Sequence, residues 1–232
     1  MSRALGRPRV HHRLTDSTNE RAKVLAAASA PHGTLVTAGE QSAGRGRQGR
    51  SWVAPAGRSL LMSLVLRDLD EADAALPLAA AVAVCEACEA VAPVRCAIKW
   101  PNDVWIERRK VAGILVEGRP QDGWAVLGIG LNVSTAAEDF PAELRGIATS
   151  LGIDAPADAV LEPLLARLAT RLADDPRAVL AAWRERDTLR GETVRWAAGE
   201  GTAAGITDGG ALVVETARGL VELGAGEVHL LR

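Results

Sequence analysis

Four apolar segments follow one another so closely between residues 94 and 133 that no helix fits between them. They read VRCAIKW, DVWIE, KVAGILVE and WAVLGIGLNV, and each has the composition of a strand. The turn ERRK separates the second segment from the third, as a hairpin loop would. Parallel neighbours would require long crossover connections. The spacing therefore lacks the parallel βαβ pattern.

Further strands and helices are predicted on either side of this region. GTLVTAGE and RSLLMSLVLR have the pattern of two more buried strands. A helix is predicted at DSTNERAKVLAAAS, where Ser17 and Glu20 have the spacing of a capping box. A second helix is predicted at LPLAAAVAVCEACEAVA, with Glu86 and Glu89 on one exposed side. Residues 1 to 13 are expected to form a loose or partly ordered arm.

The end of the chain differs in composition from the rest. Two helices are predicted between residues 157 and 187, and Pro176 suits the first turn of the second. After Leu189, short apolar segments alternate with glycine turns, a pattern typical of a small β-barrel. We therefore predict an α+β domain over residues 1–188, with helices flanking the sheet, and a small β-barrel domain over residues 189–232.

The overall charge argues against a broad polyanion-binding surface. The 232 residues carry a formal net charge of −2, whereas nucleic-acid coats and membrane-surface proteins are usually more basic. No secretory signal is visible, and the longest uncharged apolar run is shorter than the roughly 20 residues that a membrane span needs. These features predict a cytoplasmic protein with no membrane partner.

The three cysteines lie at Cys85, Cys88 and Cys96, in an alanine-rich context. The first two have CxxC spacing, but no second pair and no histidine cluster accompanies them. We interpret all three as thiols of the core, and a metal or redox site is the alternative.

The stretch GRGRQGRSW, residues 44 to 52, concentrates positive charge in one place. Its Gly-x-Gly-x-x-Gly pattern does not open a helix, as a dinucleotide fingerprint requires, because RSWVAPAGRS follows it. Glycines would let the backbone approach an anion, and Arg45, Arg47 and Arg50 could converge on it. Trp52 offers a flat face for an aromatic ring. The alternative is a solvated basic turn with a partly buried tryptophan.

Two further segments carry polar groups next to apolar strands. In KWPNDVW, Pro101 cannot donate to a sheet, so Asn102 and Asp103 are predicted to lie at a cleft where a strand restarts. Asp103 could ligate a hydrated Mg²⁺, or the pair could form a simple turn. Lys110 enters a buried strand, so it either pairs with a carboxylate or phosphate or extends to water.

Glycines also interrupt the last of the four apolar segments. Gly128 and Gly130 weaken a strand unless a ligand or another part of the chain must come close. Tight strand packing is the alternative to a ligand at these positions.

In this order, the segments DSTN, QSAGRGRQGRSW, KWPNDV, RKVAGILVE and GIGLNV resemble the biotin–protein ligase family. The resemblance implies an α+β, class II synthetase-like catalytic fold, shared by biotin and lipoate ligases. It consists of a mixed, mainly antiparallel sheet flanked by helices, followed by a small SH3-like C-terminal barrel. It implies that residues 1–188 bind biotin and ATP. The implied reaction makes biotinyl-5′-AMP from biotin and MgATP, and transfers biotin to a lysine of the biotin carboxyl carrier domain of an acyl-CoA carboxylase.

Site residues follow from the matching motifs. The resemblance assigns biotin binding to Ser17, Thr18, Gln41, Gly44, Arg45, Lys110, Gly128 and Gly130; ATP binding to Arg47, Arg50, Trp52, Asn102, Lys110 and Asn132; and catalysis to Lys110, Arg47 and Asp103. It makes residues 44 to 52 a lid that orders on binding. Asp103 would either ligate Mg²⁺ or receive the proton of the incoming lysine.

Some family members carry an N-terminal DNA-binding domain. Few residues precede DSTN here, so we expect a ligase that does not bind DNA, as a monomer or weak homodimer. The segment WAVLGIGLNV is expected to offer an edge for pairing with a partner. The alternatives are a lipoate or octanoate ligase or transferase, a biotin sensor without catalysis, and a nucleic-acid-binding module.

Overall fold

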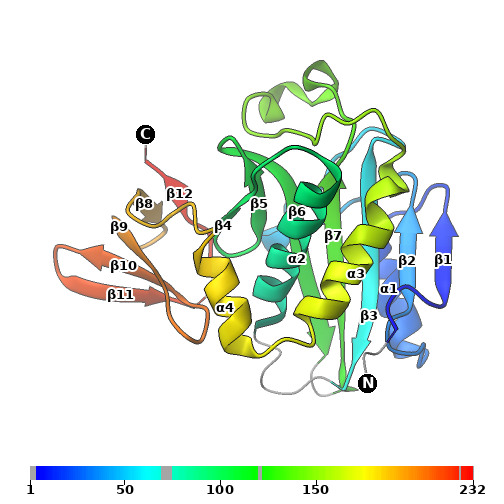
Figure 1. Ribbon diagram of the computed structural model, residues 1–232, viewed down its shortest axis with the longest axis horizontal. Helices are drawn as coiled ribbons and strands as arrows, with labels where there is room; N and C mark the ends of the chain where they lie inside the picture. The colour runs from blue at the N-terminus through cyan, green and yellow to red at the C-terminus, as the bar shows by residue number, and fades with distance from the viewer. Residues whose placement is uncertain (1–3, 69–74, 120–121, 225, 232) are drawn as a thin grey trace.

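A computed structural model of the chain describes residues 4–68, 75–119, 122–224 and 226–231. Its main sheet has seven strands in the order β1-β2-β3-β7-β6-β5-β4 (Figure 1). The strands are β1 (Arg9–His12), β2 (Leu35–Ala38), β3 (Ser59–Arg67), β4 (Ala97–Lys99), β5 (Asp103–Ile106), β6 (Arg109–Arg119) and β7 (Trp124–Asn132). Only β1 and β2 pair in parallel, and the other neighbours pair antiparallel. The predicted mainly antiparallel sheet is confirmed.

The tight β5–β6 connection explains why these strands form a hairpin. Glu107 and Arg108 both have a positive φ, and they turn the chain within the ERRK segment. β6 then pairs with β7 along its length, with Gly113 opposite Gly130. Glycines on both strands leave the middle of this pair without side chains, which gives the site a flat floor.

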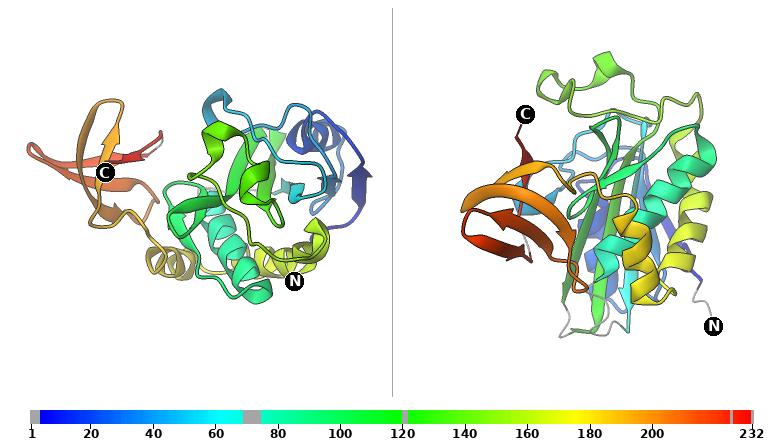
Figure 2. Two further views of the ribbon diagram at one scale, coloured as in Figure 1. Left: turned by 90° about the horizontal axis from the view of Figure 1, so that it is seen from above. Right: turned by 60° about the vertical axis from the view of Figure 1, so that its left-hand side comes forward.

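Helices cover both faces of the sheet, as Figures 1 and 2 show. α1 (Thr18–Ala27) packs on one face, and α2 (Leu76–Val91), α3 (Leu161–Arg171) and α4 (Pro176–Arg184) lie on the other. Pro176 occupies the first turn of α4, as predicted, and the Asp175 side chain caps that helix by accepting the Arg177 N–H at 2.8 Å. Short 3-10 turns lie at Arg47–Gly49, Ala137–Asp139, Ala142–Leu144 and Ala157–Val160.

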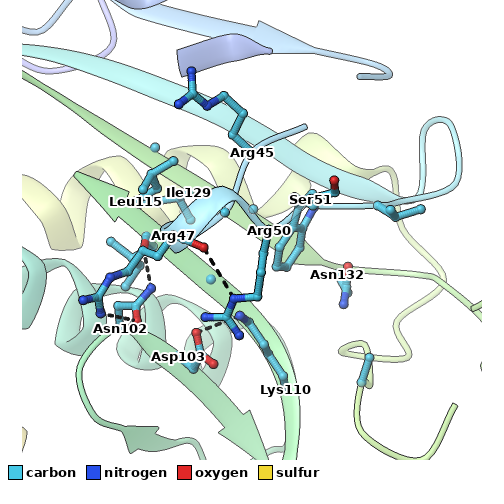
Figure 3. A pocket seen from close by; sticks show the side chains of 18 of the residues that line it. Arg45, Arg47, Arg50, Ser51, Asn102, Asp103, Lys110, Leu115, Ile129 and Asn132 are labelled. Carbon is cyan, nitrogen blue, oxygen red and sulfur yellow. Dashed lines mark hydrogen bonds and ion pairs between the residues drawn. The ribbon is translucent and has the colours of Figure 1, made fainter. Parts of the chain in front are cut away.

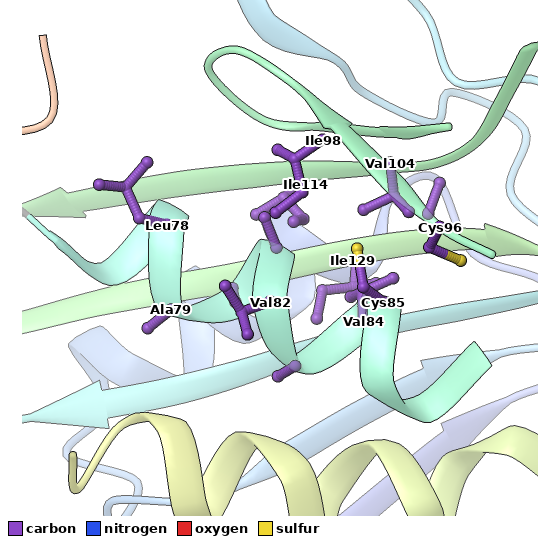
Figure 4. Packing of buried hydrophobic residues seen from close by; sticks show 14 of the residues in the cluster. Leu78, Ala79, Val82, Val84, Cys85, Cys96, Ile98, Val104, Ile114 and Ile129 are labelled. Carbon is purple, nitrogen blue, oxygen red and sulfur yellow. The ribbon is translucent and has the colours of Figure 1, made fainter. Parts of the chain in front are cut away.

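The main hydrophobic core lies between α2 and the sheet (Figure 4). α2 is apolar on nearly every side because α3, α4 and the strands surround it. Small alanines let the helix approach the sheet closely, and Ile98, Ile114 and Ile129 fill the interface from three strands. This packing supports β4 to β7 from one side, and the site is built on their other face.

A second sheet follows at the C-terminal end. It is antiparallel, in the order β11-β10-β9-β8-β12, with β8 (Thr193–Trp196), β9 (Gly199–Ile206), β10 (Leu212–Thr216), β11 (Gly219–Leu223) and β12 (His229–Leu230). It docks on the main domain, where the Trp100 indole donates to the Gly210 carbonyl at 2.9 Å and Arg184 pairs with Asp208 at 2.8 Å. The predicted small β-domain is present, and the exact boundary at 188/189 stays a prediction.

Four details predicted from the sequence were wrong. Residues 9–12 form strand β1 instead of a loose arm, because they pair with β2. Ser17 makes no side-chain capping bond, and the Asp16 carboxylate instead accepts the Ser17 N–H at 2.7 Å. Glu86 and Glu89 are partly buried, because they pair with arginines near α3 and α4.

The fourth correction concerns the strand proposed as an exposed edge. WAVLGIGLNV contains β7, which lies between β3 and β6 in the middle of the sheet. It therefore has no free edge for a partner chain. The outer strands of the main sheet are β1 and β4.

Candidate active site

A cavity of about 630 Å³ opens on the β6–β7 floor (Figure 3). The start of α1, the loop 44–53, the turn before β5 and the C-terminal residues around β12 form its walls. Every site residue predicted from the sequence lines it except Gly44. Gly44 lies just behind the wall, where its carbonyl accepts the Trp52 N–H at 2.9 Å. The motifs, which are scattered over more than a hundred residues of sequence, thus meet in one place.

One end of the cavity is a polar cluster at the start of α1. The Gln41 side-chain oxygen accepts hydrogen bonds from the Thr18 N–H at 2.7 Å and from its hydroxyl at 3.0 Å. Ser63, on β3, donates to Asn19 Oδ1 at 2.6 Å and lies 2.9 Å from the Thr18 hydroxyl. Because a protein interior holds polar groups in place only when they are paired, this end is a preorganised set of donors and acceptors.

Asn19 connects this cluster to charged side chains. Its amide donates to Glu117 at 3.0 Å, and Lys23 pairs with the same carboxylate at 3.2 Å. Burial alone would raise the pKa of Glu117, but the hydrogen bonds from Asn19 and Lys23 outweigh it and lower that pKa. Arg45 also pairs with Glu117, at 3.3 Å, and with Glu20. Arg45, the first arginine of the loop, is thereby held against the polar cluster at the start of α1.

Gly128 and Gly130 leave room for side chains of the same chain. A Cβ on Gly128 would lie 2.0 Å from Asn19 Oδ1, and a Cβ on Gly130 would lie 2.5 Å from the Trp52 ring. Trp52 therefore lies flat on the β6–β7 floor, which it could not do over side chains. The predicted close approach at both glycines is real. Its partners here are Asn19 and Trp52.

In the middle of the cavity, Lys110 pairs with Asp103. The Nζ–Oδ1 distance is 2.7 Å, and the lysine ammonium lies 5.7 Å from the centre of the Trp52 ring. Of the two interpretations of Lys110, pairing with a carboxylate is confirmed. A fixed cation beside an aromatic face can stabilise negative charge that develops nearby.

The second loop arginine is held by the turn before β5. Arg47 donates to the Asn102 side-chain oxygen at 3.0 Å, and the Asn102 amide donates to the Ile114 carbonyl at 2.6 Å. Burial lowers the pKa of Arg47, although an arginine still stays protonated. Asn102 therefore holds Arg47 at the cavity wall, and Figure 3 shows the two side chains next to each other.

Lys99 adds a further cation that the sequence analysis did not single out. It lines the cavity beside Trp105, with its ammonium 5.5 Å from the ring centre. Burial lowers the pKa of Lys99, while the neighbouring Asp103 acts in the opposite direction. The position of Lys99 inside the KWPND segment was the available signal.

Two further parts of the cavity wall are formed by Arg50 in the loop and by Asn132 at the end of β7. Arg50, in the loop, pairs with Glu227 of the C-terminal domain at 2.6 Å. The Asn132 amide donates to the Thr149 carbonyl at 3.0 Å and its oxygen accepts from Ser59 at 3.1 Å. Leu144 and Ile147 add apolar surface on the same side. The sequence analysis gave no role to Ser63, Glu227, Leu144 or Ile147, and none to Glu117, although Glu117 ends the RKVAGILVE segment.

Cys85, Cys88 and Cys96 are buried and free, as predicted for core thiols. Hydrogen bonds from the other two thiols lower the pKa of Cys96 to about 5. Among the described residues, no group of three or more histidine, cysteine, aspartate or glutamate side chains could hold a metal ion. No helix in the same part of the chain is long and apolar enough to cross a membrane.

The fold and the cavity define a class of protein in which a preorganised polar end lies beside a cluster of cations in one pocket. The model of the Biotin/lipoate A/B protein ligase family matches residues 11–134, and that of the Biotin protein ligase C terminal domain matches residues 189–231. This chain belongs to the biotin/lipoate A/B protein ligase family.

Individual relatives agree with this. The bifunctional ligase/repressor BirA of Bacillus subtilis is 36% identical over 245 residues, covering 97% of this chain and 75% of that protein. The biotin–[acetyl-CoA-carboxylase] ligase of Mycobacterium tuberculosis is 36% identical over 236 residues, covering 94% and 87%. A solved biotin protein ligase from Aquifex aeolicus in complex with biotin and ATP has a TM-score of 0.84 at 29% identity, covering 97% and 99%.

Proposed function

We propose that this protein is an ATP-dependent biotin–[acetyl-CoA-carboxylase] ligase that works through biotinyl-5′-AMP. The observation that carries the proposal is a single cavity with a preorganised amide-binding end, a cluster of cations and the Lys110–Asp103 pair between them. Relatives whose names state this activity are similar over almost the whole chain.

At the polar end, Thr18 and Gln41 would bind the ureido ring of biotin together with Ser17. These groups can offer both donors and acceptors to a cyclic urea, which needs both. Asn19 and Trp52 lie over Gly128 and Gly130 in this structure, so the bicyclic ring would reach that backbone only if these side chains move aside. Gly44 and Arg45 would close the loop over the ring. Asn19 would hold Thr18 in register through their shared partner Ser63.

In the first step, an oxygen of the biotin carboxylate attacks the α-phosphorus of ATP. A new P–O bond forms, and the bond to the pyrophosphate leaving group breaks. Lys110 would lie between the carboxylate and the α-phosphate, where its charge brings two anions together and stabilises the transition state. Arg47 and Arg50 would bind phosphate oxygens, Trp52 would stack on adenine, and Asn102 and Asn132 would complete the nucleotide site.

In the second step, the amine of a carrier lysine attacks the carbonyl carbon of the mixed anhydride. A C–N bond forms, the C–O bond to AMP breaks, and the amine loses a proton. The loop 44–52 would shield the anhydride from water until the carrier arrives. In this structure the loop contains a bridge between Arg45 and Ser51 and a 3-10 turn at Arg47–Gly49, and its ordering on binding stays a prediction.

Magnesium would arrive with ATP. A magnesium site commonly uses one or two carboxylates together with substrate phosphates and water. The described residues offer Asp103 in the cavity but no cluster of three ligands, which fits an ion held mostly by the nucleotide. Bound there, the ion would neutralise phosphate charge. Asp103 would serve either the ion or the proton of the incoming lysine.

The test is single-turnover transfer of labelled biotin to a purified biotin carboxyl carrier domain, with ATP in excess. The wild type should label one lysine of the carrier, and Lys110→Ala should lose the rate while Lys110→Arg keeps part of it. Asp208→Asn, which removes an exposed ion pair far from the cavity, is the matched control and should label at the wild-type rate. Absence of carrier labelling by the wild type would reject the proposal.

A further inference from the structure

The nucleotide end of the cavity holds more positive than negative charge. Its cations are Arg47, Arg50, Lys99 and Lys110, and the carboxylates beside them are Asp103 and Glu227. Asp103 is occupied by Lys110. Glu227 is the other anion, and it belongs to the C-terminal domain, whereas all the cations belong to the catalytic domain.

Glu227 is fixed in place from behind. It precedes β12, and the next residue, Val228, is 1% exposed and packs in the main core. Its carboxylate lies 2.6 Å from Arg50 Nη1, and its charge also acts on Lys99 and Arg47. Arg50 in turn donates from Nε to the Arg47 carbonyl at 3.4 Å. One carboxylate of the small domain thus bridges to the loop that covers the site.

We propose that Glu227 is an internal counter-anion that occupies the face of Arg50 required by the polyphosphate of ATP, so that nucleotide binding displaces it. The inference rests on the proposed function for the identity of the anion. It makes the C-terminal domain a competitor for the cationic site, and it links phosphate binding to release of the loop from that domain.

The chemistry of the groups supports such an exchange. A guanidinium binds carboxylate and phosphate through the same planar fork, so the two anions compete for the same nitrogens. A triphosphate carries more charge than one carboxylate and can engage several cations at once, so it wins the competition at sufficient concentration. When pyrophosphate forms, Glu227 is placed to take Arg50 back, which would help the product leave.

The experiment compares Glu227→Gln with the wild type. Glutamine keeps the size of the side chain and removes the charge that competes. Binding of α,β-methylene-ATP is measured by calorimetry, and inhibition by pyrophosphate and the KM for biotin are measured in the exchange reaction. For an ion pair that is half exposed on the arginine side, we expect nucleotide and pyrophosphate to bind about five-fold more tightly, with the KM for biotin unchanged.

Two controls separate this from loosened domain docking. Asp208→Asn removes another ion pair between the domains, with Arg184, away from the cations, and should leave nucleotide binding at the wild-type value. Glu227→Asp keeps the charge and should stay close to wild type. Unchanged or weaker nucleotide binding in Glu227→Gln, or the same gain in Asp208→Asn, would overturn the proposal.

The calorimetric measurement does not require turnover. A wild type that binds the analogue but does not exchange pyrophosphate with biotin would remove the proposed function and still leave the competition at Glu227 measurable. Thermal unfolding of each variant confirms that the domains remain folded.

Discussion

Replacing Gly128 with alanine should disrupt the polar cluster at the start of α1. The new Cβ would lie 2.0 Å from Asn19 Oδ1 and 2.8 Å from its Cγ, so Asn19 must move. Moving it breaks its bonds with Ser63 at 2.6 Å and with Glu117 at 3.0 Å. Overpacking costs about 1–3 kcal/mol, and losing a hydrogen bond to a charged group costs about 1.5–3 kcal/mol. Because Glu117 stays partly solvated, we expect about 3 kcal/mol in all.

Thermal unfolding measures this directly. For a chain of this size, about 3 kcal/mol corresponds to a fall in Tm of about 6–12 °C. The KM for biotin should rise as well, because Asn19 and Thr18 share Ser63. Gly224→Ala is the matched control, since a Cβ there meets nothing within 4 Å, and it should leave Tm nearly unchanged.

A double-mutant cycle identifies the clash as the cause. Asn19→Ala removes the atom that the new Cβ would strike, so adding Gly128→Ala to that variant should cost little more. The coupling energy between the two substitutions should exceed about 1 kcal/mol, well above the scatter expected for independent sites. Additive losses, or a Gly128→Ala variant as stable as Gly224→Ala, would refute the reasoning.

Three other outcomes are expected. Arg47→Ala should release biotinyl-AMP into solution and label bystander lysines, measured by chromatography of the free adenylate and by labelling of an unrelated protein; unchanged retention of the adenylate would exclude the shielding role. Burial lowers the pKa of Lys99, so its charge is lost as pH rises through a value below the ordinary 10.5. The KM for ATP should rise in that pH range for the wild type but not for Lys99→Arg. Identical pH profiles of the two proteins would contradict this prediction. The folded-state pKa of Glu117 is lowered, so its contribution to stability, about 1 kcal/mol, is present above the ordinary carboxyl pKa and is lost as pH falls through the lowered pKa. The difference in unfolding free energy between wild type and Glu117→Gln should therefore disappear in acid. A difference that persists in acid would rule out the ionised, hydrogen-bonded carboxylate as its source.

The sequence predicted most elements because their signals are local. The composition and length of the apolar segments predict β3 to β7 and α2. Strand β1 does not, because the four polar and apolar residues RVHH become a strand only by pairing with β2. The burial of Glu86 likewise depends on Arg171, which is 85 residues away along the chain. Such contacts leave no periodic pattern.

The order of the strands in the main sheet could not be predicted from the sequence either. β7 follows β6 in the chain but also pairs with β3, so a segment that was expected to offer an edge lies in the centre. An apolar run by itself does not distinguish a central strand from an exposed one.

The site was predictable to the extent that its residues lie in compact motifs. Each motif is one short turn or strand end, and the sheet brings these together on one floor. Asn19 lies inside DSTN, yet its role depends on the missing side chain at Gly128, more than a hundred residues later. Glu227 comes from the other domain and reaches the cavity only through docking, which no local pattern encodes.

Activation of biotin with ATP in this cavity can be measured on the protein itself. The most direct measurement is exchange of labelled pyrophosphate into ATP by the purified chain, in parallel reactions with biotin, lipoate and octanoate. We expect exchange with biotin alone, abolished in Lys110→Ala and retained in Asp208→Asn. Exchange with lipoate or octanoate instead would assign the protein to the lipoate branch of the family. No exchange with any of the three acids would contradict activation of biotin in this cavity.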